Sequence, residues 1–211
     1  TVMGAGMLWV GWFGFNGGSA LAANGDAAMA MLVTHISAAT GAMLWMIMEW
    51  LKFGKPSALG AVTGMVAGLG TITPASGFVG PGGALVIGIL AGFICFNATM
   101  YMKRVLKIDD SLDVFPVHGV GGMLGTLMAG IFSATGLGVF SGYGFADGIS
   151  SMGGQVYVQL IGVAATVVFT AVVTYVILKL VGALLGLRVD EDQETEGLDI
   201  ALHDERGYDI S

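Results

Sequence analysis

The sequence predicts an all-α membrane protein with six transmembrane helices, and three observations support this prediction. Hydrophobic residues make up 55% of the 211 residues and charged residues only 11%, whereas soluble domains usually carry about 25% charged residues. The mean hydropathy is +0.82, and the apolar residues gather into segments long enough to span a bilayer. Glycine is abundant, with 36 residues and no collagen-like period, which favours helices that pack closely in lipid.

Six apolar segments define the expected spans. They cover residues 2–22, 27–51, 57–74, 82–103, 113–135 and 151–187. A transmembrane helix needs about 20 residues, so the longer sixth segment is expected to tilt strongly or to project beyond the bilayer. These segments place a transmembrane helical region in residues 1–187.

The C-terminal tail, residues 188–211, differs in composition from the rest of the chain. Nine of the fifteen acidic residues lie from Asp190 onward. Such a run of like charges predicts a solvated, partly disordered segment. Leu198 and Ile200 interrupt the acidity with an apolar pattern, which leaves room for a docked cytoplasmic segment.

Basic residues occur only in every second connection between the predicted spans and at the C-terminal end. The first, third and fifth connections between the predicted spans contain no Lys or Arg. All eight basic residues therefore fall on one side of the membrane, which the positive-inside rule makes cytoplasmic, together with both ends of this chain. In chain order these residues are Lys52, Lys55, Lys103, Arg104, Lys107, Lys179, Arg188 and Arg206.

Small residues recur at the spacing of helix-packing faces. This spacing lets the backbones of neighbouring helices approach closely, so it predicts a compact bundle and by itself indicates no transport function. The residues are Gly60, Gly64 and Gly68 in the third segment, Ala84, Gly88 and Gly92 in the fourth, and Gly121 and Gly125 in the fifth.

His118, near the start of the fifth segment, is the strongest candidate for a functional residue. An ionisable side chain inside a span is costly, and it usually faces the bundle interior or a cavity. Val114, Phe115 and Gly122 share its helix face, which leaves a narrow apolar passage beside the imidazole. A neutral imidazole offers one hydrogen-bond donor and one acceptor, so it can relay a proton or bind a small polar solute. The alternative is a core histidine that a neighbouring helix satisfies.

Two aspartates precede this helix, and either is suited to begin it. Asp110 and Asp113 both have side chains that can cap a helix N-terminus. If Asp113 is the cap, Pro116 lies in the first helical turn, which proline tolerates. If Asp110 is the cap, we expect a kink close before His118.

An aromatic group lies on the first segment. Trp12, Phe15 and Ser19 share one helix face, toward the outer half of the membrane. Aromatic faces attract cations by about 0.5–2 kcal/mol, and a hydroxyl supplies a hydrogen-bond acceptor, so these residues together suit a cation site at an outer mouth. The alternative is an interfacial aromatic belt. His35, inside the second segment, receives no role.

An enzyme is not expected from this sequence. It contains no Cys, His, Asp and Glu cluster with the spacing of a metal site, no phosphate-binding glycine-rich loop followed by lysine, and no nucleophile elbow. We expect no cofactor. The chain also has no basic patch that would indicate a nucleic-acid partner.

Several motifs resemble those of the ammonium transporter (Amt/Mep/Rh) family, in its microbial and plant branch. They are residues 11–19 (GWFGFNGGS), 73–75 (TPA), 110–122 (DSLDVFPVHGVGG), 186–189 (GLRV) and 196–199 (EGLD). The resemblance extends over essentially all 211 residues. It implies an eleven-helix inverted-repeat fold, of which this chain resembles helices six to eleven. The partners that it implies are ammonium or ammonia, the bilayer of the cell (inner or plasma) membrane, the missing N-terminal half and two further copies in a homotrimer.

The resemblance also implies roles for the outer residues. Trp12 and Ser19 correspond to contributors to the external ammonium-binding site, whose other aromatic residues belong to the missing half. Phe15 corresponds to the gate phenylalanine of this half.

Further roles follow for the fifth segment and the tail. His118 corresponds to one of two paired pore histidines, Val114 to an apolar pore-lining residue, and Asp110 to an aspartate with a structural or proton-related role. The tail resembles a segment that contacts neighbouring subunits and supports regulation by a PII-type protein. It departs from the family pattern at Asp204, which follows His203 where glycine is usual.

The expected function is transport of ammonium or ammonia. The cation is captured at the outer aromatic site and loses its proton, and ammonia then passes the pore histidine. One alternative is an ammonium sensor that signals through the cytoplasmic tail. Another is a membrane scaffold in which His118 is buried.

Overall fold

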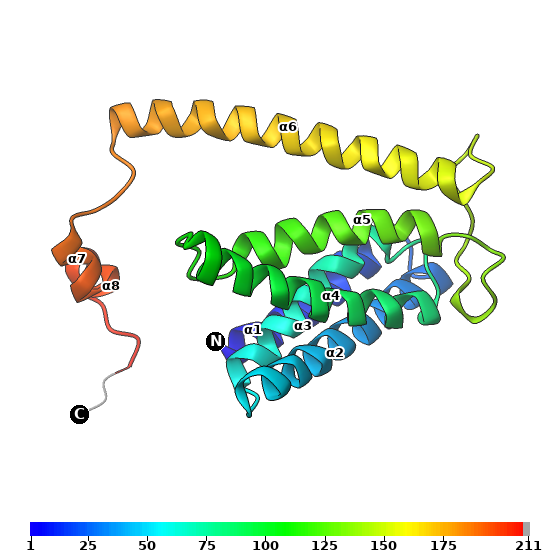
Figure 1. The fold of residues 1–211 in the computed structure, drawn as a ribbon, viewed down its shortest axis with the longest axis horizontal. Helices are drawn as coiled ribbons and strands as arrows, with labels where there is room; N and C mark the ends of the chain where they lie inside the picture. Colours follow the sequence, from blue (N-terminus) through cyan, green and yellow to red (C-terminus); the bar gives the residue numbers. More distant parts are fainter. Residues whose placement is uncertain (209–211) are drawn as a thin grey trace. The chain divides into compact units, whose positions relative to one another are not determined.

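The computed structural model describes residues 1–208, and its regular elements in that range are helices (Figure 1). Residues 1–163 and residues 164–211 form two compact units. In chain order the α-helices are α1 (Val2–Gly18), α2 (Gly25–Phe53), α3 (Ala58–Ile72), α4 (Pro81–Tyr101), α5 (Gly121–Phe132), α6 (Met152–Leu184), α7 (Glu191–Glu196) and α8 (Leu198–His203). The short elements are the 3₁₀ turns η1 (Thr73–Ala75) and η4 (Gly138–Phe140) and the π-helical segments η2 (Met102–Leu106) and η3 (Phe115–Val120).

The all-helical membrane architecture predicted from the sequence is confirmed. Each of the six apolar segments contains one long helix, and five helical spans within residues 1–208 are long and apolar enough to cross a membrane. α1 has 17 residues and lies at the short end of the range for a transmembrane helix. It ends four residues before the predicted boundary at residue 22, where the chain turns and Leu21 takes a positive φ of 57°.

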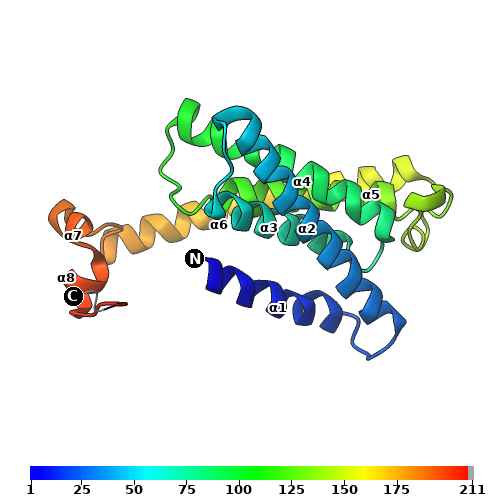
Figure 2. The same ribbon diagram turned by 90° about the horizontal axis from the view of Figure 1, so that it is seen from below.

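The core of the first unit lies between α2, α3, α4 and α5. α3 contacts each of the other three helices, and α1 packs against α2 and α3 (Figure 2). The largest fully buried side chains come from these helices and the turn after η1: Phe96, Leu69, Ile72, Ile87, Val33 and Val79. α3 is therefore the element around which the other helices are arranged.

Glycines let these helices meet at backbone distance, as the small-residue pattern predicts. A Cβ at Gly88 would lie 2.6 Å from the carbonyl oxygen of Ser37, and one at Gly41 would lie 2.6 Å from that of Gly64. A Cβ at Gly125 would overlap the carbonyl oxygen of Thr71. The hydroxyl of Ser37 also donates a hydrogen bond to the carbonyl oxygen of Gly68 at 2.9 Å. Close van der Waals packing and interhelical hydrogen bonds are the forces expected to hold helices together in lipid.

Polar side chains satisfy the backbone groups at the ends of α2 and α3. The Asn24 side chain accepts hydrogen bonds from two N–H groups in the first turn of α2. Gly54 ends α2 with a positive φ of 79°, a conformation that glycine adopts without strain. The Glu49 carboxylate accepts hydrogen bonds from the backbone N–H and the hydroxyl of Ser57 at 2.6 and 3.1 Å. Ser57 in turn caps α3 through Gly60.

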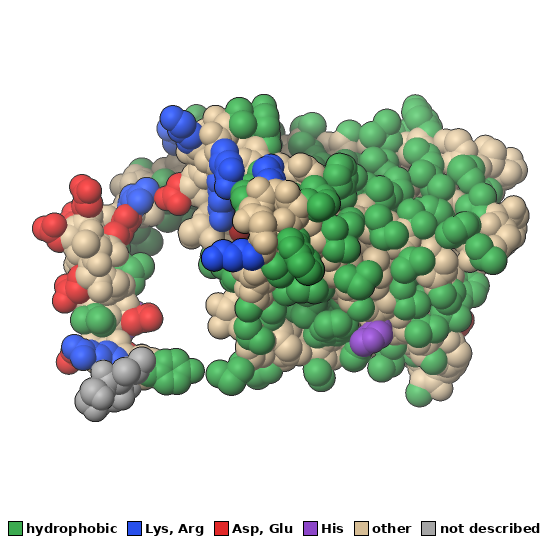
Figure 3. All heavy atoms as spheres, turned by 60° about the horizontal axis from the view of Figure 1, so that its bottom comes forward, with side chains coloured by type: hydrophobic (Ala, Val, Ile, Leu, Met, Phe, Trp, Pro, Cys, Tyr) green, Lys and Arg blue, Asp and Glu red, His purple; other side chains and the backbone are tan. Residues whose placement is uncertain are grey.

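Cationic side chains gather at one end of the bundle in the first unit. In Figure 3 they form a blue group there, and much of the remaining visible face is apolar. Two of these cations lie over aromatic rings: Lys52 Nζ is 5.5 Å from the ring centre of Phe96, and the Arg104 guanidinium is 5.1 Å from that of Phe53. Such contacts hold the ends of α2 and α4 together while the charges reach water.

The second unit contains α6 from Ala164 onward and the tail. α6 is exposed along nearly its whole length, as expected for a helix that lipid or another chain covers. Its 33 residues correspond to about 50 Å, which is longer than the hydrocarbon core of about 30 Å. The acidic tail contains the short helices α7 and α8, whereas the sequence predicts a partly disordered segment. Residues 209–211 lie outside the described range.

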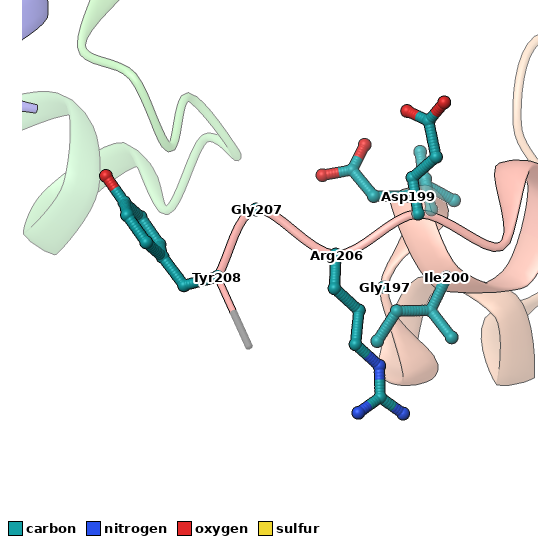
Figure 4. A pocket seen from close by; sticks show the side chains of 8 residues that line it. Gly197, Asp199, Ile200, Arg206, Gly207 and Tyr208 are labelled. Atoms are coloured by element: carbon teal, nitrogen blue, oxygen red, sulfur yellow. The ribbon is translucent and has the colours of Figure 1, made fainter. Parts of the chain in front are cut away.

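One residue pair orders the start of the tail. The Arg188 guanidinium donates two hydrogen bonds to the Glu194 carboxylate, one of them 2.7 Å long, so the start of the tail is tied to α7. An open hollow of about 460 Å³ lies between α8 and the residues that follow it, with Asp199, Arg206 and Tyr208 among its lining residues (Figure 4).

Close backbone approach gives a stability prediction. Gly125→Ala places a Cβ against the Thr71 carbonyl group, so we expect the free energy of unfolding to fall by about 1–3 kcal/mol. Gly122→Ala is the control in the same helix, because no atom lies within 4 Å of its added Cβ. Thermal unfolding of the solubilised protein measures both variants, and equal stability of the two would contradict the packing.

The Arg188 contact gives a pH prediction for the tail. Its hydrogen bonds lower the pKa of Glu194. A carboxyl group with a lowered pKa in the folded state stabilises that state above its unfolded pKa. This contribution is lost as pH falls through the folded pKa. We expect NMR titration to give Glu194 a lower pKa in the native protein than in an Arg188→Gln variant, and coincident titration curves would contradict the contact.

Candidate functional site

His118 lies at the beginning of the fifth membrane helix, within the π-helical segment η3. Its side chain is exposed in this chain, as are those of Val114 and Phe115, which are 52% and 53% exposed. The buried-histidine alternative therefore does not hold within this chain. The imidazole instead lies on an apolar surface.

Asp110, in the connection before this helix, caps its first turn. Its two carboxylate oxygens accept hydrogen bonds from the backbone N–H groups of Val114 and Phe115, both at 2.9 Å. A carboxylate in this position satisfies donors that have no partner within the helix, and it interacts favourably with the helix dipole. Of the two alternatives that the sequence leaves open, the structure selects Asp110.

The segment that follows this cap is π-helical. Pro116 is buried within η3 and has no N–H group to donate, so the regular hydrogen-bond ladder is interrupted beside it. Local π-helical turns are rare and often occur at functional sites. Here the irregular turn carries His118.

α3 and the 3₁₀ turn η1 that continues it contact both parts of the candidate site. A Cβ at Gly70 would lie 3.8 Å from Nδ1 of His118, so a glycine on α3 borders the imidazole. Three residues further on, Thr73 Oγ1 accepts a hydrogen bond of 2.7 Å from Nε1 of Trp12. The Thr73 hydroxyl also donates to the carbonyl oxygen of Leu69 at 2.7 Å, which fixes the orientation of this acceptor.

The aromatic group on α1 is present as predicted. The ring centres of Trp12 and Phe15 are 5.9 Å apart. Phe15 is 64% exposed. The Ser19 hydroxyl lies just beyond the end of α1, where it donates a hydrogen bond of 2.7 Å to the carbonyl oxygen of Phe15. Trp12 and Phe15 also border a shallow apolar hollow of about 500 Å³ on the surface of α1.

His35 lies apart from this arrangement. Its ring centre is 5.1 Å from that of Trp9 and 6.0 Å from that of Phe13, so it belongs to an aromatic stack between α1 and α2. The described residues 1–208 contain no group of three potential metal ligands.

Sequence reasoning did not identify Gly70 and Thr73 as site residues. Gly70 resembles the many packing glycines of the chain, and Thr73 resembles an ordinary residue at the end of a helix. Their role becomes apparent only in the tertiary structure, where Gly70 of α3 borders His118 and Thr73 of η1 bonds to Trp12. Thr73 does lie in the TPA motif of residues 73–75, but that motif does not by itself indicate a contact with Trp12.

The arrangement links an aromatic group on α1 to an exposed imidazole through α3 and η1. The rings of Trp12 and Phe15 can stabilise a cation, and the imidazole of His118 can accept or donate a proton. The exposed apolar surface around His118 is not closed within this chain. A complete passage therefore requires a second wall.

Comparison with known proteins identifies the family. The sequence profile of the Ammonium Transporter Family matches residues 1–208. The ammonium transporter Amt1 of Archaeoglobus fulgidus is 46% identical over 99% of this chain, and an ammonium transporter of Bacillus subtilis is 42% identical over 100% of it. The matches cover 51% and 52% of those relatives, so the chain spans about half the length of the curated relatives it matches. These relatives are described as transporters rather than as enzymes.

Solved structures give the same result. A structure described as a sensor Amt protein aligns with a TM-score of 0.85 at 31% identity, over 95% of this chain and 48% of the other. The crystal structure of Saccharomyces cerevisiae Mep2 aligns with a TM-score of 0.79 at 37% identity, over 90% of this chain and 43% of the other. The chain thus belongs to the ammonium transporter family, and it is an integral membrane protein.

Proposed function

We propose that this chain forms one half of a pathway that carries ammonium or ammonia across a membrane. The observation that carries the proposal is the exposed His118 imidazole on an apolar surface, linked through α3 and η1 to the Trp12 ring, which lies beside that of Phe15. An ionisable group in a span is costly unless it faces protein or a cavity. An exposed imidazole therefore favours a wall of a passage over a lipid-facing surface.

Capture of the cation is assigned to the outer aromatic group. Trp12 and Phe15 offer ring faces to a small cation, and Ser19 lies one helical turn beyond Phe15. The hydroxyl of Ser19 keeps acceptor capacity when it donates to the Phe15 carbonyl. Phe15 is the proposed gate, because its exposed ring lies beside Trp12 at the apolar hollow on α1.

Passage requires loss of charge. Moving an ion through a narrow apolar passage is expensive, and removal of one proton from ammonium eliminates most of this cost. The His118 imidazole is suited to hydrogen-bond the resulting ammonia and to relay the proton. Val114 is proposed to line the same passage, and Asp110 is proposed to act structurally by capping the helix that carries His118.

The other wall of the passage is proposed to come from an N-terminal half absent from this chain. Inverted-repeat transporters form their substrate site between two halves, and the relatives are about twice as long as this chain. We further propose a homotrimer in the cell membrane, with residues 1–187 as the transmembrane region, both ends of this chain in the cytoplasm and a tail (188–211) accessible to a PII-type regulatory protein. The basic end of the first unit supports this orientation.

Transport is favoured over the sensor alternative. The curated relatives named above are described as ammonium transporters, although one aligned structure is described as a sensor. A sensor would also need no continuous passage beside His118. The exposed apolar surface at this residue therefore supports the transport proposal.

The role of His118 can be tested by substitution in the complete transporter. We expect His118→Ala to abolish methylammonium uptake or to change its ion selectivity, because the proton-relay group is lost. His35→Phe is the matched control, since it removes a membrane histidine but keeps a ring beside Trp9 and Phe13. Uptake and selectivity equal to those of the native protein in His118→Ala would refute the assignment.

The bond between Trp12 and Thr73 can be tested separately. Thr73→Val keeps the size of the side chain but removes the acceptor, so the Trp12 ring is no longer held. We expect the substrate concentration for half-maximal uptake to rise by roughly 5–30-fold, as for loss of a hydrogen bond of about 1–2 kcal/mol. Thr73→Ser, which keeps the hydroxyl, should behave like the native protein, and an unchanged half-saturation value in Thr73→Val would contradict this role.

A further inference from the structure

The connection between α4 and the fifth membrane helix contains an ion pair that joins the two helices. Nζ of Lys103, in the π-helical segment η2 at the end of α4, lies 2.7 Å from Oδ1 of Asp113. The Asp113 side chain is 16% exposed and that of Lys103 is 38% exposed. Because a largely buried carboxylate is costly without a partner, the two side chains are expected to remain together.

Asp113 also has an unusual backbone conformation. Its φ is +56°, a left-handed conformation that residues other than glycine, asparagine and aspartate seldom adopt. Its N–H donates to the carbonyl oxygen of Asp110 at 3.2 Å, and its own carbonyl oxygen accepts from Val117 at 3.1 Å. Backbone and side chain together hold Asp113 at the point where the helix begins.

This ion pair differs in effect from the Asp110 cap. The carboxylate of Asp110 binds N–H groups four and five residues further along the same segment, so it orders the helix start locally. The Lys103–Asp113 pair instead connects the helix start to α4. Five residues later, His118 lies against Gly70 of α3, so the segment between them is held by α4 at one end and by α3 at the other.

We propose that the Lys103–Asp113 ion pair positions His118, and that Asp113 is thereby a positioning residue for the transport pathway. This inference rests on the proposed function of His118. The intervening segment η3 is π-helical and contains Pro116, so it lacks the full hydrogen-bond ladder that would otherwise fix it. The Lys103–Asp113 ion pair restricts this segment in place of the missing backbone hydrogen bonds. Without it, the helix start can shift, and the imidazole shifts with it.

The test uses the complete transporter reconstituted in liposomes, with rates normalised to folded protein. We expect Lys103→Met and Asp113→Asn each to slow ammonium transport several-fold, within the limit of about 100-fold that a misplacement of about 1 Å costs. Asparagine tolerates the left-handed conformation, so Asp113→Asn removes the charge and keeps the backbone preference. The double variant should be no slower than the slower single variant, because both remove one interaction.

A second readout separates positioning from a merely structural role. Loss of folded transporter lowers ammonium and methylammonium rates in the same proportion, whereas a displaced imidazole changes their ratio. We expect Lys103→Met and Asp113→Asn to change this ratio. Lys103→Arg, which keeps a cation opposite Asp113, should retain the native ratio. Lys107→Gln is the matched control, because it removes a cation from the same connection without altering the Lys103–Asp113 contact.

The outcomes distinguish this inference from the proposed function. A ratio and rates equal to those of the native protein in both single variants, with His118→Ala impaired, would overturn the inference and leave the proposed function intact. A proportional loss of both rates would likewise overturn it. Unimpaired transport in His118→Ala would overturn the proposed function itself.

Discussion

The close approach of α3 to its neighbours is the constraint on which the rest of this structure depends. In lipid there is little hydrophobic driving force between helices, so packing distance and interhelical hydrogen bonds decide their association. The carbonyl groups of Gly64 and Thr71, both on α3, lie where side chains at Gly41 of α2 and Gly125 of α5 would otherwise stand. Because α3 is held at this distance, its Gly70 borders His118 of the fifth membrane helix, and Thr73 of the following turn η1 bonds to Trp12 of α1.

The same constraint explains how the candidate site is assembled. Neither Trp12 nor His118 has its surroundings set by its own helix alone. The Trp12 indole is oriented by Thr73, and the His118 imidazole is bordered by Gly70. Two groups about 100 residues apart in sequence are therefore positioned by the same short stretch of chain, where α3 continues into η1. In the proposed pathway this turn connects cation capture with proton transfer.

The start of the fifth membrane helix combines strong local order with an irregular backbone. Asp110 satisfies two N–H groups, while Asp113 adopts a left-handed conformation and pairs with Lys103. Between this start and α5, Pro116 prevents a regular ladder. A helix with an interrupted ladder needs external supports to hold one side chain in place, and the contacts with α4 and α3 provide them.

The sequence by itself determined the helical membrane class, the approximate spans and the small-residue faces, because these depend on hydrophobic length and residue size along the chain. It also singled out Trp12, Phe15 and His118, whose chemistry is unusual within apolar segments, although their transport roles remain proposals. Only the tertiary structure decided that Asp110 is the cap, that the segment carrying His118 is π-helical, and that Gly70 and Thr73 join the site. The Asp110 cap and the π-helical segment depend on the local backbone geometry, for which the sequence leaves alternatives open. The roles of Gly70 and Thr73 depend on contacts between elements far apart in the sequence, and a sequence pattern does not specify the relative depth and rotation of such elements.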